Sequence, residues 1–164
     1  MEDPGKNYRI SKEGKPMLAK VNFDAFWNYV HAFGRACDFI GRNFGDQALR
    51  QFFVDRGRET KLPRLKEALN YDGRLFMQAF CQSLNNIGSE FTVEENDNEI
   101  VVRGTCNTGG RYVREEQGAS NENGIPYYCM HCSIWWEDLP KEIGFPLTFQ
   151  RAEKGIGCAW HLKK

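Results

Sequence analysis

The period of the apolar residues changes once along this chain of 164 residues, close to Gly88. Before this glycine, apolar side chains recur at steps of three and four residues, which is the period of an amphipathic helix. After it, Phe91 and Val93 alternate with polar residues, and Ile100 and Val102 repeat the pattern. Alternation with a period of two is typical of β-strands. The change predicts an α+β fold, with an N-terminal helical half packed on an antiparallel sheet of two hairpins, in the order ββ-α-ββ.

The N-terminal half is expected to contain four helices. Asn22 is a suitable N-cap for the first, Gly45 ends it, and Asp46 caps the second. A short third helix runs from about residue 63 to residue 70, and Asp72 caps a longer fourth. The apolar stripe of the first helix is formed by Phe23, Phe26, Trp27, Val30, Phe33, Cys37, Ile40 and Phe44.

The second half is expected to supply the strands. Residues 96 to 98 are Asn-Asp-Asn, which favours a turn between the two strands of the first hairpin. Residues 107 to 110 contain two glycines and are predicted to form a flexible turn. A short helix then begins at Pro126. The second hairpin has its strands at residues 147 to 151 and 158 to 162.

The domain organisation and location follow from composition. Residues 1–20 form a polar lead-in that is expected to be loosely ordered, and residues 21–164 form a single domain. The 22 basic residues balance the 22 acidic ones, so no net charge draws the chain to nucleic acid or to anionic membranes. No apolar run predicts a membrane span, and residues 1 to 6 lack the apolar core of a secretory signal. We therefore expect a cytoplasmic protein with no nucleic-acid or membrane partner.

The cysteines are the best candidates for chemistry. In a cytoplasmic chain, six cysteines are more typical of metal ligands, catalytic thiols or buried small side chains than of disulfides. Cys129 and Cys132 have the C-x-x-C spacing that supplies half of a tetrahedral zinc site. Cys106, after the first hairpin, and Cys158, in the last strand, are expected to complete the set. The alternatives are an iron–sulfur cluster on the same thiols, a thiol redox pair, or unrelated buried cysteines.

Two side chains near the C-x-x-C motif are candidates for proton transfer. His131 lies between the two cysteines, although on a regular helix it is expected to face away from them. Glu137 follows the motif and is a candidate general base on a metal-bound water. His161 is three residues after Cys158 in a predicted strand and is expected on the opposite face. Three thiolates with an open position indicate a catalytic metal, and four indicate a structural one.

Aromatic residues make up 13% of the chain. This fraction indicates either an aromatic core, which is the simpler interpretation, or a pocket for an apolar ligand. If there is such a pocket, the residues expected to enclose the ligand are Phe26, Trp27, Phe80, Trp135 and Trp136.

The arrangement of these motifs resembles two related families. Helices rich in Phe and Trp are followed by a hairpin ending in Cys106, the Cys129–Cys132 pair, and Gly-Cys-x-Trp-x-Leu at residues 157 to 162. Over residues 23 to 164 this is similar to the vinyl-reductase-type small-molecule-binding domain and to the L-2-amino-thiazoline-4-carboxylic acid hydrolase family. The resemblance implies an α+β domain that tends to form dimers, cysteine ligands for zinc, and a small molecule held between helices and sheet.

Two functions are therefore expected. The first is a zinc-dependent hydrolase that opens a small nitrogen- and sulfur-containing heterocycle by water attack, as the hydrolase resemblance implies. The second is a non-catalytic small-molecule-binding or sensor module, in which the four thiolates hold a structural zinc. An iron–sulfur protein is a third, less favoured alternative.

Overall fold

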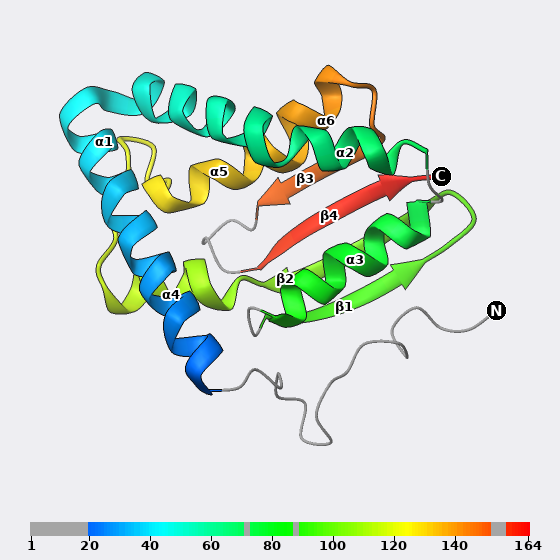
Figure 1. Ribbon diagram of the computed structural model, residues 1–164, viewed down its shortest axis with the longest axis horizontal. Coiled ribbons are helices and arrows are strands. Elements are labelled where there is room, and N and C mark those ends of the chain that lie inside the picture. Colours follow the sequence, from blue (N-terminus) through cyan, green and yellow to red (C-terminus); the bar gives the residue numbers. More distant parts are fainter. Residues whose placement is uncertain (1–19, 71–72, 87–88, 152–156) are drawn as a thin grey trace.

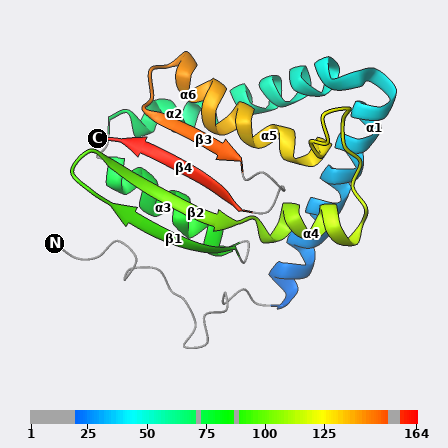
Figure 2. The ribbon, with the colours of Figure 1, turned by 180° about the vertical axis from the view of Figure 1, so that it is seen from behind.

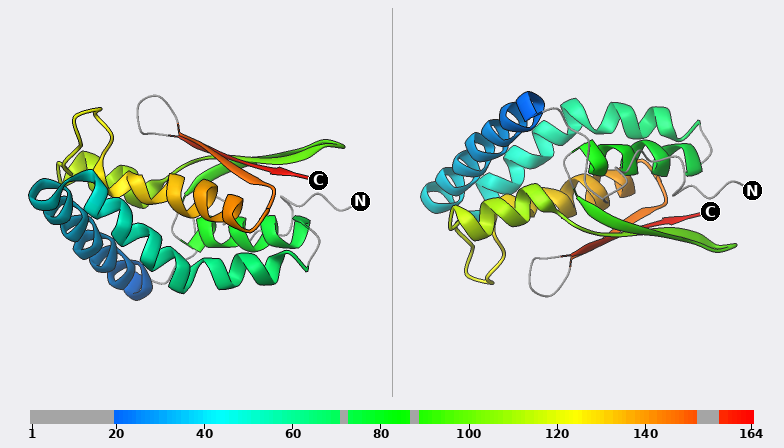
Figure 3. Two further views of the ribbon diagram at one scale, coloured as in Figure 1. Left: turned by 90° about the horizontal axis from the view of Figure 1, so that it is seen from above. Right: turned by 90° about the horizontal axis from the view of Figure 1, so that it is seen from below.

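The chain folds into two layers, a group of helices and a sheet. The computed structural model describes residues 20–70, 73–86, 89–151 and 157–164. The sheet has four strands in the order β1-β2-β4-β3, all antiparallel. The helices gather on one side of it (Figure 3). The predicted α+β class and the antiparallel sheet are confirmed, whereas the predicted lead-in at residues 1–20 lies, but for its last residue, outside the described residues.

The longest element is α1, Lys20–Thr60, which bends sharply at Gly45 (Figure 1). Gly45 has φ 80° and ψ 174°. Because a positive φ costs glycine little and other residues more, the bend falls at this position. The two arms of α1 correspond to the first two predicted helices, with Gly45 at the predicted boundary between them. None of the helices in the described ranges is long and apolar enough to cross a membrane.

Two further helices match the prediction closely. They are α2, Leu62–Ala68, which has a proline in its first turn, and α3, Gly73–Asn86. Helix α3 lies on one face of the sheet, and Figure 2 shows the sheet in front of it. Its apolar face, with Met77, Phe80 and Leu84, is buried in the larger core.

The sheet consists of two hairpins joined side by side. Strands β1, Glu90–Glu95, and β2, Glu99–Thr105, form the first hairpin, and β3, Leu147–Arg151, and β4, Cys158–Lys163, form the second. Strands β2 and β4 pair at the centre. One face carries Val102, Trp160 and Phe149 in register and packs on the helices. The predicted alternation holds in β3, whereas in the central strands Val101 and Ala159, on the other face, are buried as well.

The segment between the hairpins differs most from the prediction. Residues 107 to 110 do not form a turn, because they belong to α4, Asn107–Glu115. Gly109 packs against the ring of Tyr128, where a Cβ would come within 2.7 Å of a ring carbon, so this glycine serves close packing rather than a turn. After the loop, four short helical pieces follow instead of one helix: η2, Tyr127–Cys129; α5, Met130–Ser133; η3, Ile134–Asp138; and α6, Leu139–Glu142.

Candidate functional site

The four predicted metal-ligand cysteines come from separate parts of the fold. Cys106 is the N-cap of α4, and its Sγ accepts a hydrogen bond of 3.2 Å from the backbone N–H of Gly109. Cys129 ends η2, Cys132 lies in α5, and Cys158 is the first residue of β4. All four are half-buried, and all six cysteines of the chain are free thiols.

The four thiols lie close enough together to interact electrostatically. Burial, the largest cause, and the charges of Cys106 and Cys158 together raise the pKa of Cys129 to about 12. Burial also raises the pKa of Cys132 well above its usual value, with added contributions from Cys106, Cys129 and Cys158. The strand register places Cys158 opposite Gly104, two residues before Cys106, and opposite Arg151. The structure therefore brings Cys106 and Cys158 to one end of the sheet, where Arg151 also meets the segment that carries Cys129 and Cys132.

Two cationic side chains flank the thiols. Arg151, at the end of β3, donates a hydrogen bond of 2.8 Å from Nη2 to the backbone carbonyl of Cys129, and its charge lowers the pKa of both Cys129 and Cys132. Lys61 Nζ lies 5.1 Å from the ring centroid of Trp135. Burial lowers the pKa of Lys61, whereas the charge of Cys132 raises it. Neither cation was predicted, because each comes from an element distant in sequence from the C-x-x-C motif.

His131 contacts the thiol cluster directly. Its Nε2 lies 3.3 Å from Cys132 Sγ, and its Nδ1 is hydrogen-bonded to the backbone carbonyl of Tyr128. Because a carbonyl only accepts, Nδ1 carries the proton, and Nε2 of the neutral ring is left to accept from the thiol. Burial lowers the pKa of His131 to about 4, so the ring is neutral at pH 7. The expectation that His131 faces away from the cysteines was wrong.

The reason for this error is local geometry. His131 follows a 3-10 turn and precedes a π-helical turn, so the side chains here do not follow regular α-helical spacing. The ring packs between aromatic side chains, with its centroid 4.6 Å from that of Trp135 and 5.1 Å from that of Tyr128. These contacts hold the ring at the thiols.

The other predicted histidine and the predicted base lie elsewhere. Glu137 pairs with Lys141 at 2.8 Å, one turn along the chain, and no recorded contact in the described residues joins it to the thiols. His161 is in register with Val101, and its Nδ1 lies 3.2 Å from a carboxylate oxygen of Glu99. It is on the face opposite Cys158, as predicted.

The predicted pocket aromatics are mostly part of the core. Phe80 packs between Trp136 and Trp160, each with its centroid 5.0 Å away. Trp135 donates from Nε1 to the backbone carbonyl of Phe53 at 2.8 Å. Trp27 packs against the small cluster of Val30, Tyr112 and Tyr128, while the side chain of Phe26 lies outside the described part of the chain. Two surface cavities, of about 580 and 470 Å³, are lined by other residues.

A buried polar pair fixes the helix that carries Cys106. The hydroxyl of Tyr112, in α4, donates to Asp38 Oδ2, in α1, at 2.9 Å, and both residues are buried. Gly34 faces the Tyr112 ring so closely that a Cβ would overlap it. Asp38 Oδ1 has no partner among the described residues. In the sequence, the only indication of the contact between α1 and Tyr112 is Gly34 itself, because a glycine in the middle of a predicted helix often marks close packing.

The four cysteines lie in neighbouring segments, but their side chains do not have the geometry of a metal site in this structure. In the described ranges, no three or more histidine, cysteine or acidic side chains stand in an arrangement that would hold a metal ion as it is. The chain matches none of the family models, curated proteins or solved structures with which it was compared. The family resemblance therefore stays a prediction.

Proposed function

We propose that the protein binds one Zn²⁺ through Cys106, Cys129, Cys132 and Cys158, and that this zinc is the structural clip of a small-molecule-binding module. The observation that carries the proposal is the placement of three of these residues at one end of the sheet. Cys158 pairs with Gly104, two residues before Cys106, and with Arg151, which donates to the backbone carbonyl of Cys129. Four cysteines around one centre, two of them at C-x-x-C spacing, make the usual ligand set of a structural zinc site.

The charges around the cluster support this proposal. Four thiolates and one Zn²⁺ carry two net negative charges, and buried charge needs a partner of opposite sign. Arg151 and Lys61 supply two positive charges beside Cys129 and Cys132. Both cations are half-buried, Arg151 on the carbonyl of Cys129 and Lys61 over the ring of Trp135, and from there each can offset the negative charge of a zinc–thiolate centre.

The metal-free arrangement of the thiols is compatible with zinc binding. With their pKa values raised, Cys129 and Cys132 are protonated at neutral pH. Zinc binds thiolates, so its binding displaces these protons and replaces repulsion between the thiolates with attraction to the cation. We expect the four sulfur atoms to move closer together when zinc binds.

One observation favours a second candidate function, the hydrolysis of a small nitrogen- and sulfur-containing heterocycle. His131 is neutral at pH 7, and its Nε2 lies beside Cys132. Once Cys132 is a zinc-bound thiolate it no longer donates to Nε2, and the neutral imidazole is then suited to take the proton from an attacking water. In this alternative His131, and not Glu137, is the general base, because Glu137 is paired with Lys141.

We also propose that the protein works in the cytoplasm with a small molecule as its partner, and that it forms a homodimer. Free thiols used as metal ligands fit a reducing compartment. The balanced charge of the chain gives no attraction to nucleic acid or membranes.

Metal analysis of purified protein tests the zinc site. We expect about one zinc per chain, and loss of zinc in both Cys129→Ser and Cys158→Ser. Cys81→Ala is the matched control, since Cys81 is a buried thiol of α3 outside the proposed ligand set, and this variant should keep the zinc. Zinc-free wild type, or zinc retained in both serine variants, contradicts the proposal. A brown protein with broad visible absorption indicates an iron–sulfur cluster instead.

X-ray absorption at the zinc edge separates the two candidate functions. A structural clip gives a first shell of four sulfur atoms near 2.3 Å. A shell of three sulfur atoms and one lighter atom favours the hydrolase. A slow turnover of 2-aminothiazoline-4-carboxylate that is lost in His131→Phe would support the same conclusion.

A further inference from the structure

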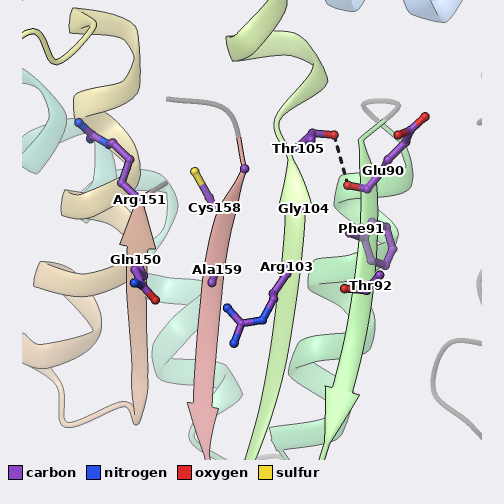
Figure 4. Close-up of a pocket in the computed structure, with 11 residues that line it drawn as sticks. Glu90, Phe91, Thr92, Arg103, Gly104, Thr105, Gln150, Arg151, Cys158 and Ala159 are labelled. Atoms are coloured by element: carbon purple, nitrogen blue, oxygen red, sulfur yellow. Dashed lines mark hydrogen bonds between the residues drawn. The ribbon is translucent and has the colours of Figure 1, made fainter. Parts of the chain in front are cut away.

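The larger of the two cavities, about 580 Å³, is a trough on the sheet (Figure 4). Its lining comes entirely from the strands and from the residue before β4, with no helical residue: Glu90, Phe91, Thr92, Arg103, Gly104, Thr105, Gln150, Arg151, Gly157, Cys158 and Ala159. The helices lie on the opposite side of the sheet (Figure 3). The trough therefore opens on the face that the helices of the described chain leave uncovered.

The strand register explains why there is a depression here. Thr92, Arg103, Ala159 and Gln150 form one row across β1, β2, β4 and β3, and residues in such a row share a face. At this end of the sheet the outward residue of β4 is Ala159, and the residue just before the strand is Gly157. Small side chains on a central strand, between longer ones on its neighbours, leave a trough along β4.

The walls of the trough carry hydrogen-bond donors that the fold does not use. Figure 4 shows the Arg103 side chain reaching from β2 towards Ala159. Its closest recorded carboxylate is Glu94, at 3.8 Å, and an exposed ion pair at that distance contributes little. In the described structure, Thr92 and Gln150 make no side-chain hydrogen bond. A guanidinium, an amide and a hydroxyl thus line one face of the sheet, on β2, β3 and β1.

We propose that this trough binds a small organic carboxylate, held by Arg103 through two parallel N–H···O bonds. The planar guanidinium matches a carboxylate in this bidentate way, and the amide of Gln150 is placed for a second polar group of the ligand. Glu90 and Glu94 at the rim repel a doubly charged group, so a monoanionic carboxylate fits better than a phosphate. The volume lies in the range of small-molecule sites. The inference does not depend on the zinc site.

Titration of the ¹⁵N-labelled protein, as purified, with benzoate tests the proposal. We expect saturable shifts of the amides of Thr92, Arg103, Gln150 and Ala159, with a dissociation constant of roughly 1 mM, as for a fragment-sized ligand. Benzamide, the neutral analogue, should bind at least about tenfold more weakly, because it has no carboxylate to accept two hydrogen bonds from the Arg103 guanidinium.

Variants locate the binding. Arg103→Gln should abolish the shifts, and Arg103→Lys should weaken binding about tenfold because lysine lacks the planar fork. Arg56→Gln is the matched control, since Arg56 is an exposed arginine on α1, far from the sheet in sequence, and should bind benzoate like wild type. The amide spectrum of each variant reports whether it is folded.

Three results would overturn the proposal. They are unchanged benzoate binding by Arg103→Gln, shifts that map away from the trough, and inorganic phosphate binding as tightly as benzoate. Ala159→Leu is a second, independent test, because a larger side chain on β4 fills the trough without removing a hydrogen-bond donor. If a folded Ala159→Leu variant binds benzoate like wild type, the ligand does not lie over β4.

Discussion

At the residue scale, the sequence identifies the candidate thiols but not the charged and polar side chains around them. The four cysteines were singled out by their type and spacing, and the strand register and the Arg151 hydrogen bond bring the segments that carry them to one end of the sheet. The two cations beside them come from the end of β3 and from the residue after α1, so only the fold reveals them. The orientation of His131 was missed because it depends on a non-α turn.

The Tyr112–Asp38 hydrogen bond supports a prediction at this scale. Tyr112→Phe keeps the ring packing but leaves the Asp38 carboxylate with neither oxygen bonded, because Oδ1 already has no partner among the described residues. We expect a loss of about 2 kcal/mol in the free energy of unfolding, which is the usual cost of an unpaired buried polar group. Urea denaturation, followed by circular dichroism, measures it.

A double substitution checks the cause. Replacing both partners, as Tyr112→Phe with Asp38→Leu, removes the unpaired carboxylate, so most of the lost stability should return. If Tyr112→Phe alone costs less than about 0.5 kcal/mol, the hydrogen bond does not hold α4 to α1 as described.

At the scale of the elements, α1 is the support against which the later segments pack. Gly34 and Gly41 are seven residues apart on it and so lie on one face, the first against the ring of Tyr112 and the second against that of Tyr127. Without side chains at these positions, α4 and η2, which carry Cys106 and Cys129, approach α1 closely. The glycines therefore help to place two of the four thiols.

Gly34→Ala tests this packing. At an open position in a helix, alanine in place of glycine stabilises by about 1 kcal/mol. At Gly34 the new methyl group overlaps the buried ring of Tyr112, and overpacking costs about 1 to 3 kcal/mol, so we expect net destabilisation. Thermal unfolding measures the sign. In a Tyr112→Leu background the same substitution should become neutral or stabilising, and equal costs in both backgrounds would rule out the ring contact.

Whether an element could be predicted from the sequence depends on whether it has an apolar period of its own. The arms of α1, the helices α2 and α3 and all four strands have their own apolar periods and were predicted within a few residues. The helices between Asn107 and Glu142 are too short to show a clear apolar period. Contacts with α1 and β3 fix them instead, and such contacts cannot be read from the local sequence. Gly109 illustrates the difficulty: a Gly-Gly pair favours a turn locally, yet here it lies in α4 against Tyr128.

At the scale of the whole molecule, the thiol cluster joins the two layers. Cys158 belongs to the central strand β4, Cys106 follows the central strand β2, and Cys129 and Cys132 lie in the segment that packs on α1. A metal ion bound to all four fastens the helical layer to the sheet at one end of the strands. If zinc binds the folded chain as proposed, its removal by a chelator should lower the melting temperature.

The pH dependence of zinc affinity gives the sharpest test of this arrangement. The raised pKa values of Cys129, about 12, and of Cys132 keep both thiols protonated between pH 6 and pH 8. Each zinc ion must then displace at least these two protons, so affinity rises with pH. We expect the dissociation constant to fall at least about 100-fold per pH unit in this window, ten-fold for each proton released.

Competition with a chromophoric chelator at several pH values, corrected for protonation of the chelator, measures this dependence. Cys132→Ser removes one displaced proton along with one ligand, so its residual affinity should be weaker and its slope shallower by about one proton. An affinity that does not change with pH would mean that the ligands are already thiolates in the metal-free protein. The burial of Cys129 and Cys132 would then not govern the site, and the charges of Arg151 and Lys61 would dominate instead.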